Sequence, residues 1–105
     1  MGFLTKLFGS NKTDGINTYL KKGAILLDVR TKSEYNSVHL KNALHIPLQD
    51  IKENINKIKK LNKPVITYCQ SGMRSRSAAK ILRLAGINAI NGGGILGLKR
   101  KLNEA

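Results

Sequence analysis

Short apolar runs alternate with amphipathic stretches along most of the chain, and this alternation limits the possible folds more than any other feature. The runs 24–29 (AILLDV) and 64–69 (PVITYC) show no polar alternation, which is typical of strands that are covered on both faces of a sheet. Between and after these runs, apolar residues recur at steps of three and four, which favours helices. Strands that alternate with helices usually form a parallel sheet. We therefore expect an α/β fold with a mostly parallel sheet.

Capping residues and glycines predict where the helices begin and end. Thr13 or Asp14 caps a first helix that Gly23 ends, and the pair Thr31 and Glu34 forms a capping box for a short helix. The other expected elements are a strand at 43–46, an amphipathic helix at 48–58, a helix after the cysteine loop, a strand at 87–90, and a basic helix that follows a glycine triplet at 92–94.

The size and composition of the chain restrict its class. Its 105 residues suit one domain, which we place at 13–105 after an N-terminal extension at 1–12. A single cysteine excludes an internal disulfide, and His39 and His45 lack the spacing of paired metal ligands, so we expect no metal and no cofactor. No apolar run is long enough to span a bilayer, and MGFLTKLFGS matches no secretion or myristoylation pattern, so we expect a cytoplasmic location.

The net charge of +13 favours anionic partners. The lysines are scattered, however, and aromatic residues make up only 5% of the chain, with none placed among the basic runs as a base-stacking surface requires. We therefore do not expect nucleic-acid binding. No pattern in the sequence indicates an oligomeric state.

The only cysteine, Cys69, ends an apolar run and opens the loop YCQSGMRS. In open α/β sheets, ligands bind at this edge, where parallel strands end. The backbone N–H groups from Gln70 to Ser75 can turn inward around an anion, and a helix N-terminus lowers the pKa of a nearby thiol. Gly72 permits the required backbone geometry, and Arg74 adds positive charge. These features favour a nucleophilic thiol; the alternative, a small apolar residue at a strand end, stays open.

Four motifs, LLDVRTKSEY, HLKNALHIPL, YCQSGMRS and NGGG, resemble in their order and separation a rhodanese domain over about residues 16–98. The resemblance implies a five-stranded parallel sheet with helices on both faces. It also implies sulfur transfer, in which a cysteine takes sulfur from a small anionic donor such as thiosulfate. The resulting persulfide passes the sulfur to cyanide, a thiol or a protein thiol. By matching position Cys69 is the nucleophile, and the loop that holds the persulfide or the donor consists of Gln70, Ser71, Gly72, Met73, Arg74 and Ser75.

Asp28 and Arg30 match the D-x-R element of this family, and we interpret them as a structural hydrogen-bond network. We interpret His39 and His45 as scaffold residues, because a preformed thiolate needs no separate base. Where the family usually has glycine, this chain has Val38 before His39 and Asn42 in the following turn. Asparagine can still adopt a left-handed backbone conformation.

Three other functions compete with sulfur transfer by an enzyme. Cysteine-dependent phosphatases use a C-x5-R loop, whereas four residues separate Cys69 from Arg74, and the smaller loop suits a sulfur atom or thiosulfate better than phosphate. Non-catalytic rhodanese-like binding modules typically lose the cysteine, which is present here. A persulfide carrier for one protein partner differs only in its acceptor and remains open.

Overall fold

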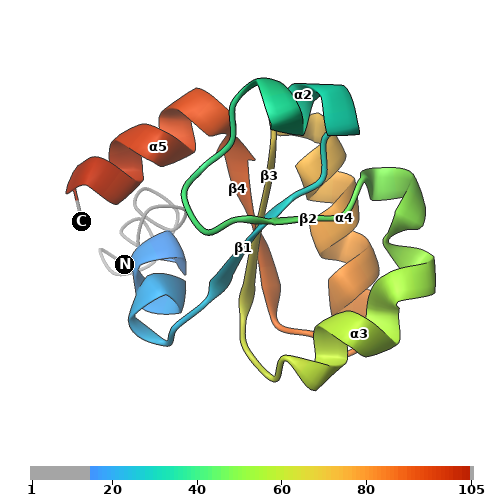
Figure 1. Cartoon of the computed structure of the whole chain (residues 1–105). Helices are drawn as coiled ribbons and strands as arrows, with labels where there is room; N and C mark the ends of the chain where they lie inside the picture. Colours follow the sequence, from blue (N-terminus) through green and yellow to red (C-terminus); the bar gives the residue numbers. More distant parts are fainter. Residues whose placement is uncertain (1–14, 105) are drawn as a thin grey trace, which may run out of the picture.

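The computed structural model describes residues 15–104 and contains, within that range, a sheet of four parallel strands (Figure 1). The strands are β1 (Ile25–Asp28), β2 (Leu44–His45), β3 (Val65–Cys69) and β4 (Ala89–Gly94), and their order in the sheet is β2-β1-β3-β4. The predicted parallel α/β fold is confirmed. The count of five strands is wrong for the described residues, because it came from the resemblance, whereas the sequence itself contains four apolar runs of strand length.

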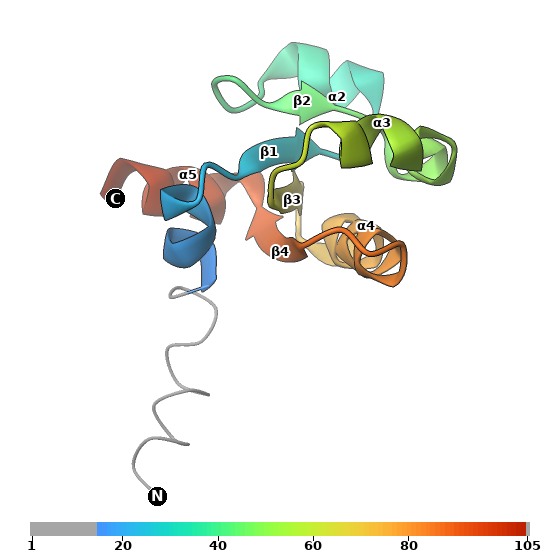
Figure 2. The same cartoon turned by 90° about the horizontal axis from the view of Figure 1, so that it is seen from below.

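Helices cover both faces of the sheet (Figure 2). The 3-10 turns η1 (Leu48–Asp50) and η2 (Lys52–Asn54), helix α3 (Ile55–Lys60) and helix α4 (Met73–Leu84) cover one face, and the helix over 15–21 and α5 (Ile95–Glu104) cover the other. Side chains of β3 alternate between the two cores, since Val65 and Cys69 face α4 while Ile66 and Tyr68 face α5. Across residues 15–104, every helix is too short or too polar to cross a membrane.

Local sequence rules account for several element boundaries. Helix α2 (Lys32–Ser37) begins with the predicted capping box, in which Glu34 N–H donates to Thr31 Oγ1 at 3.2 Å and Thr31 N–H donates to Glu34 Oε1 at 3.0 Å. Asn42 has φ +66°, so it provides the left-handed turn that glycine usually provides. The predicted cap at Thr13 or Asp14 and the predicted extension at 1–12 lie outside the described residues.

The segment predicted as one helix at 48–58 is divided into η1, η2 and α3. The division occurs around Asn54, whose side-chain amide donates to the carbonyl of Asp50 at 2.8 Å and whose backbone has φ −109° and ψ 11°. A side chain that competes for a backbone carbonyl in this way interrupts a regular helix. The apolar spacing predicted the buried face correctly, because Ile51 and Ile58 lie in the core.

Strand β4 begins at Ala89, two residues after the start of the predicted strand at 87–90, and continues through the glycine triplet to Gly94. It pairs with β3 in parallel and places Gly94 opposite Cys69. A Cβ on Gly94 would lie 2.6 Å from the carbonyl oxygen of Gln70, which no real side chain tolerates. The glycines therefore allow β4 to approach the cysteine loop closely.

Candidate active site

Cys69 is the last residue of β3, and α4 begins four residues later at Met73. The turn between them depends on Gly72, which caps α4 in a left-handed conformation with φ +99°. A side chain would be strained at this φ, and its Cβ would also lie 3.3 Å from Gly93 Cα. The predicted position of the cysteine, between a parallel strand and a helix N-terminus, is confirmed.

The sulfur of Cys69 is fully buried and accepts hydrogen bonds from its own loop. Gly72 N–H donates to Sγ at 3.0 Å and Ser75 N–H at 3.4 Å, and the Ser75 hydroxyl oxygen lies 3.4 Å from the same sulfur. Of the amides from Gln70 to Ser75, at least those of Gly72 and Ser75 are therefore turned toward the sulfur. The first turn of a helix has unpaired N–H groups available for this purpose.

Two opposing effects set the acidity of Cys69. Burial raises the pKa of the thiol, whereas hydrogen bonds from the hydroxyl and amide of Ser75 and from the amides of Gly72 and Ser71 lower it. The hydrogen bonds outweigh burial, so the pKa of Cys69 lies below its ordinary value. A lowered pKa increases the fraction of thiolate, the nucleophilic form of cysteine.

The other loop side chains point in different directions. Met73 is 78% exposed, and Gln70 accepts a hydrogen bond from Arg30 Nη1 at 3.3 Å. The two terminal nitrogens of Arg74 donate to the carboxylate of Glu34 at 2.7 and 2.9 Å. Hydrogen bonds from Arg74 and Thr31 lower the pKa of Glu34 to about 2. The positive charge predicted beside the sulfur is thus paired with a carboxylate from α2.

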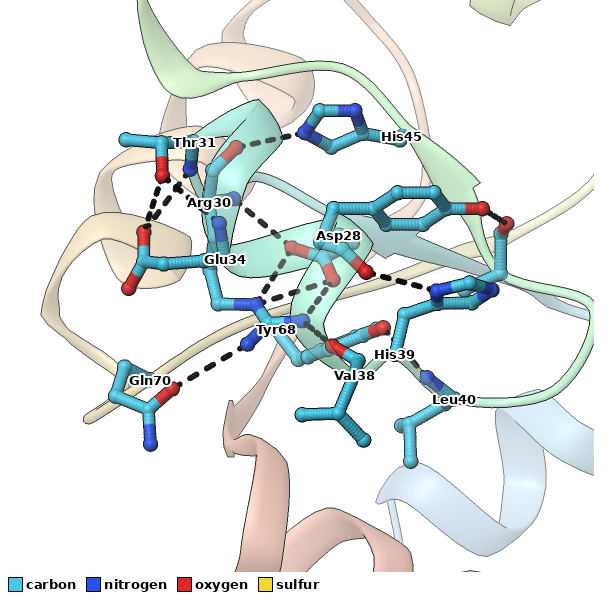
Figure 3. Close-up of polar contacts among 12 residues, drawn as sticks. Asp28, Arg30, Thr31, Glu34, Val38, His39, Leu40, His45, Tyr68 and Gln70 are labelled. Carbon is cyan, nitrogen blue, oxygen red and sulfur yellow. Dashed lines mark hydrogen bonds and ion pairs between the residues drawn. The ribbon is translucent and has the colours of Figure 1, made fainter.

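Asp28 and Arg30 form a buried network at the end of β1, as Figure 3 shows. Arg30 donates to Asp28 from Nε at 2.9 Å and from Nη2 at 2.6 Å, and Nη2 also donates to the carbonyl of Val38 at 2.6 Å. Burial alone would raise the pKa of Asp28, but the hydrogen bonds from Arg30 hold it below its usual value. Because Arg30 also contacts Gln70, the network joins β1, the loop after α2 and the cysteine loop.

The two histidines contact backbone carbonyls and the ring of Tyr35. His39 Nδ1 lies 2.9 Å from the carbonyl of Tyr35, and His45 Nε2 lies 2.8 Å from the carbonyl of Arg30 (Figure 3). Both rings stack on Tyr35, with centroids 3.9 and 4.4 Å away. These contacts agree with the interpretation of both histidines as scaffold residues.

Sequence analysis missed Asn91 of β4, which contacts the loop. Its Oδ1 lies 2.6 Å from the Ser75 hydroxyl oxygen, and its Nδ2 donates to the carbonyl of Gly72 at 3.0 Å. The sequence indicated only that an asparagine precedes the glycine triplet. The pairing of β4 with β3, which brings Asn91 beside the loop, is a tertiary feature.

Comparisons with known proteins show which proteins this chain is similar to. The family model of the rhodanese-like domain matches residues 13–100. Uncharacterized protein YqhL of Bacillus subtilis is 42% identical over 67 residues, which cover 64% of this chain and 52% of that protein. Thiosulfate sulfurtransferase GlpE of Coxiella burnetii is 37% identical over 62 residues, covering 59% and 57%. A solved structure of a rhodanese with anions from E. coli has a TM-score of 0.64 and 33% identity, and the similarity covers 70% of this chain and 89% of that chain.

The parallel α/β fold and the cysteine between a parallel strand and a helix N-terminus agree with the class of protein that the sequence motifs indicated, a rhodanese-type domain. The match of the family model over 13–100 shows that this chain belongs to the rhodanese-like domain family. The alignments span little more than half the length of the two curated relatives.

Proposed function

We propose that this protein is a sulfurtransferase that carries sulfur as a persulfide on Cys69. The observation that supports this most is the environment of the sulfur, which is buried among N–H donors and has a lowered pKa. Donors of this kind stabilise a negative charge on sulfur without neutralising it through a direct ion pair. We take residues 13–105 as the transferring domain.

The reaction consists of two half-reactions. The thiolate of Cys69 attacks the outer sulfur of thiosulfate, a new S–S bond forms, and sulfite leaves with the electron pair of the bond that breaks. An acceptor such as cyanide or a thiolate then attacks the terminal sulfur of the persulfide. The Cys69 thiolate leaves in this second step and is regenerated. A protein thiol as acceptor would make the same chain a persulfide carrier for a partner.

The terminal sulfur needs space that the described loop does not leave open, because the side chain of Cys69 has no exposed surface. The loop covering it must therefore adjust when a donor reacts. Two residues at the start of α4 could move with the loop: Met73, which is exposed, and Arg74, which forms an ion pair with Glu34 of α2. A donor anion competes with Glu34 for the guanidinium of Arg74.

The geometry is less suited to a phosphatase. A phosphate-binding loop needs its arginine to fold over the bound anion, whereas Arg74 is bonded to Glu34 in a forked ion pair. The spacing of four residues between Cys69 and Arg74 also makes the loop shorter than C-x5-R. We therefore expect negligible hydrolysis of aryl phosphates by the native protein.

Intact-mass measurement tests the proposal. Thiosulfate without an acceptor should add one sulfur atom to the protein, cyanide should remove it, and steady-state kinetics should be ping-pong. Cys69→Ser should lose both the adduct and the turnover, because a serine hydroxyl is far less acidic than a thiol. A native protein that never gains the sulfur, or a Cys69→Ser variant that still turns over thiosulfate, would contradict the proposal. If the adduct forms and only a protein thiol removes it, the protein is a carrier.

A further inference from the structure

The hydroxyl of Ser75 lies between two acceptors but has a single proton to donate. Its oxygen is 2.6 Å from Asn91 Oδ1 and 3.4 Å from Cys69 Sγ. Ser75 is fully buried, so the structure places no bulk solvent around this hydroxyl. The direction of the Ser75 proton therefore determines whether the sulfur has a hydrogen-bond donor or a lone pair in front of it.

The orientation of the Asn91 amide follows from two backbone groups. Gly93 N–H donates to Oδ1 at 2.9 Å, and Nδ2 donates to the carbonyl of Gly72 at 3.0 Å. A flipped amide would place its NH2 group against the N–H of Gly93 and its oxygen against the carbonyl of Gly72. Both contacts would be repulsive, so Oδ1 faces Ser75.

Because Oδ1 only accepts, the short contact to Ser75 requires the hydroxyl to donate to Asn91. In that arrangement a lone pair of the Ser75 oxygen faces Sγ, where it can accept the S–H of a neutral Cys69 thiol. A Cys69 thiolate instead needs the hydroxyl to rotate toward it, which breaks the bond to Asn91. The two acceptors thus compete for the same proton.

We propose that Asn91 is a positioning residue that sets the acidity of Cys69 by competing with its sulfur for the hydroxyl proton of Ser75. The inference rests on the proposed function only in taking Cys69 as the nucleophile. Asn91 favours states in which Sγ carries no charge, namely the thiol and the persulfide, whose charge lies on the terminal sulfur. It thereby limits how much thiolate is present before a donor arrives.

Other charged groups near the site do not depend on Asn91. Arg74 of α4 is paired with Glu34 of α2, and Asp28 is paired with Arg30 at the end of β1. Tyr68 of β3 stays neutral because burial raises its pKa, and β4 itself carries no titratable side chain. A change at Asn91 therefore acts on Cys69 through Ser75 or through the shape of the loop.

A double-mutant cycle separates those two routes. The ultraviolet absorbance of the thiolate is followed against pH, with Cys69→Ala as the blank, for the wild type, Asn91→Ala, Ser75→Ala and the double variant. Asn91→Ala should lower the titration midpoint by about one pH unit, because Ser75 is then free to donate to the thiolate. Ser75→Ala should raise the midpoint. Adding Asn91→Ala to Ser75→Ala should leave it unchanged, because the shared proton is gone.

The opposite sign or the lack of coupling would overturn the inference. An unchanged or raised midpoint in Asn91→Ala does so, and so does a shift of equal size in both backgrounds, since that would show an effect of loop shape alone. Asn91→Asp provides a second test that keeps the size of the side chain. It should raise the midpoint more when Ser75 is present than in Ser75→Ala; equal shifts would again overturn the inference.

The titration needs no sulfur donor, so its outcome is separate from that of the proposed function. If the titration shows coupling between Asn91 and Ser75 but no sulfur adduct forms, this inference is supported and sulfur transfer is contradicted. If the adduct forms but the titration shows no coupling, sulfur transfer is supported and this inference is contradicted.

Discussion

Two polar groups lie at the same edge of the sheet, at the ends of the neighbouring strands β1 and β3, and the fold treats them differently. Asp28 is bonded to a guanidinium through contacts of 2.6–3.1 Å. Cys69 instead contacts neutral groups of its own loop, among them the amides of Gly72 and Ser75 and the hydroxyl of Ser75, at 3.0–3.4 Å. A directly bonded countercharge fixes a buried anion in place, whereas neutral donors stabilise an anion and leave its lone pairs reactive. We therefore expect Asp28 to stabilise the fold and Cys69 to react with the sulfur donor.

Removing the sulfur should have the largest effect on activity and a small one on stability. In Cys69→Ala, sulfur transfer should fall to the rate without protein, because the chain has no other thiol. The free energy of unfolding should change by only about 1 kcal/mol, the usual scale for losing one heavy atom from a core. Urea unfolding and a thiosulfate–cyanide assay measure the two quantities. Turnover by Cys69→Ala above the protein-free rate would contradict the role of Cys69 as the nucleophile.

Removing the countercharge of Asp28 should instead act on stability. Arg30→Met leaves a buried carboxylate unpaired and should lower the free energy of unfolding by about 3–5 kcal/mol at neutral pH. In the native protein the pKa of Asp28 is lowered, so the pair contributes above the unfolded value of 3.8 and its contribution is lost as pH falls through the folded pKa. The deficit of Arg30→Met should therefore shrink in acid.

The double variant Asp28→Asn with Arg30→Met is the matched control for that prediction. It removes both charges and should recover part of the lost stability, because no unpaired charge remains buried. If Arg30→Met unfolds in urea like the wild type, the pair of Asp28 and Arg30 does not stabilise the fold.

The sequence predicted the features of this site that depend on neighbouring residues and missed the contacts between residues far apart in the chain. The capping box of Thr31 and Glu34 and the place of Cys69 at a strand end depend on neighbouring residues, and both are present. The pairing of Arg74 with Glu34 joins residues 40 positions apart, and no local pattern contains it. The contact of Ser75 with Asn91 likewise depends on which strands pair and in which register.

The close approach of β4 to the cysteine loop should be sensitive to one methyl group. In Gly94→Ala the new Cβ would meet the backbone oxygen of Gln70 at 2.6 Å, so the loop or the strand must move. We expect a loss of about 1–3 kcal/mol in stability, together with slower sulfur transfer. Gly97→Ala in α5 is the control, because nothing lies within 4 Å of its Cβ, and it should stabilise the helix slightly. Equal behaviour of the two variants would show that the close approach does not matter.

The smallest expected effect concerns the ion pair between Arg74 and Glu34. Glu34→Gln should free the guanidinium to bind an anionic donor, so KM for thiosulfate should fall a few-fold while kcat stays nearly constant. Stability should change by less than about 1 kcal/mol, because both side chains are partly exposed. Arg74→Ala should raise KM for thiosulfate more than it slows transfer from an uncharged donor.

Two observations separate this effect of Arg74 from that of overall charge. Arg76→Ala removes the same charge from the same helix and should leave KM closer to the wild-type value.

The pKa of Glu34 is about 2, so the Glu34 carboxylate stays paired with Arg74 at every pH above 4.5, the ordinary pKa of a glutamate. The pair breaks only as pH falls toward 2. The benefit of Glu34→Gln should therefore be constant across neutral pH. Equal losses with charged and uncharged donors in Arg74→Ala would mean that Arg74 acts on the thiol or the loop, and not on the donor.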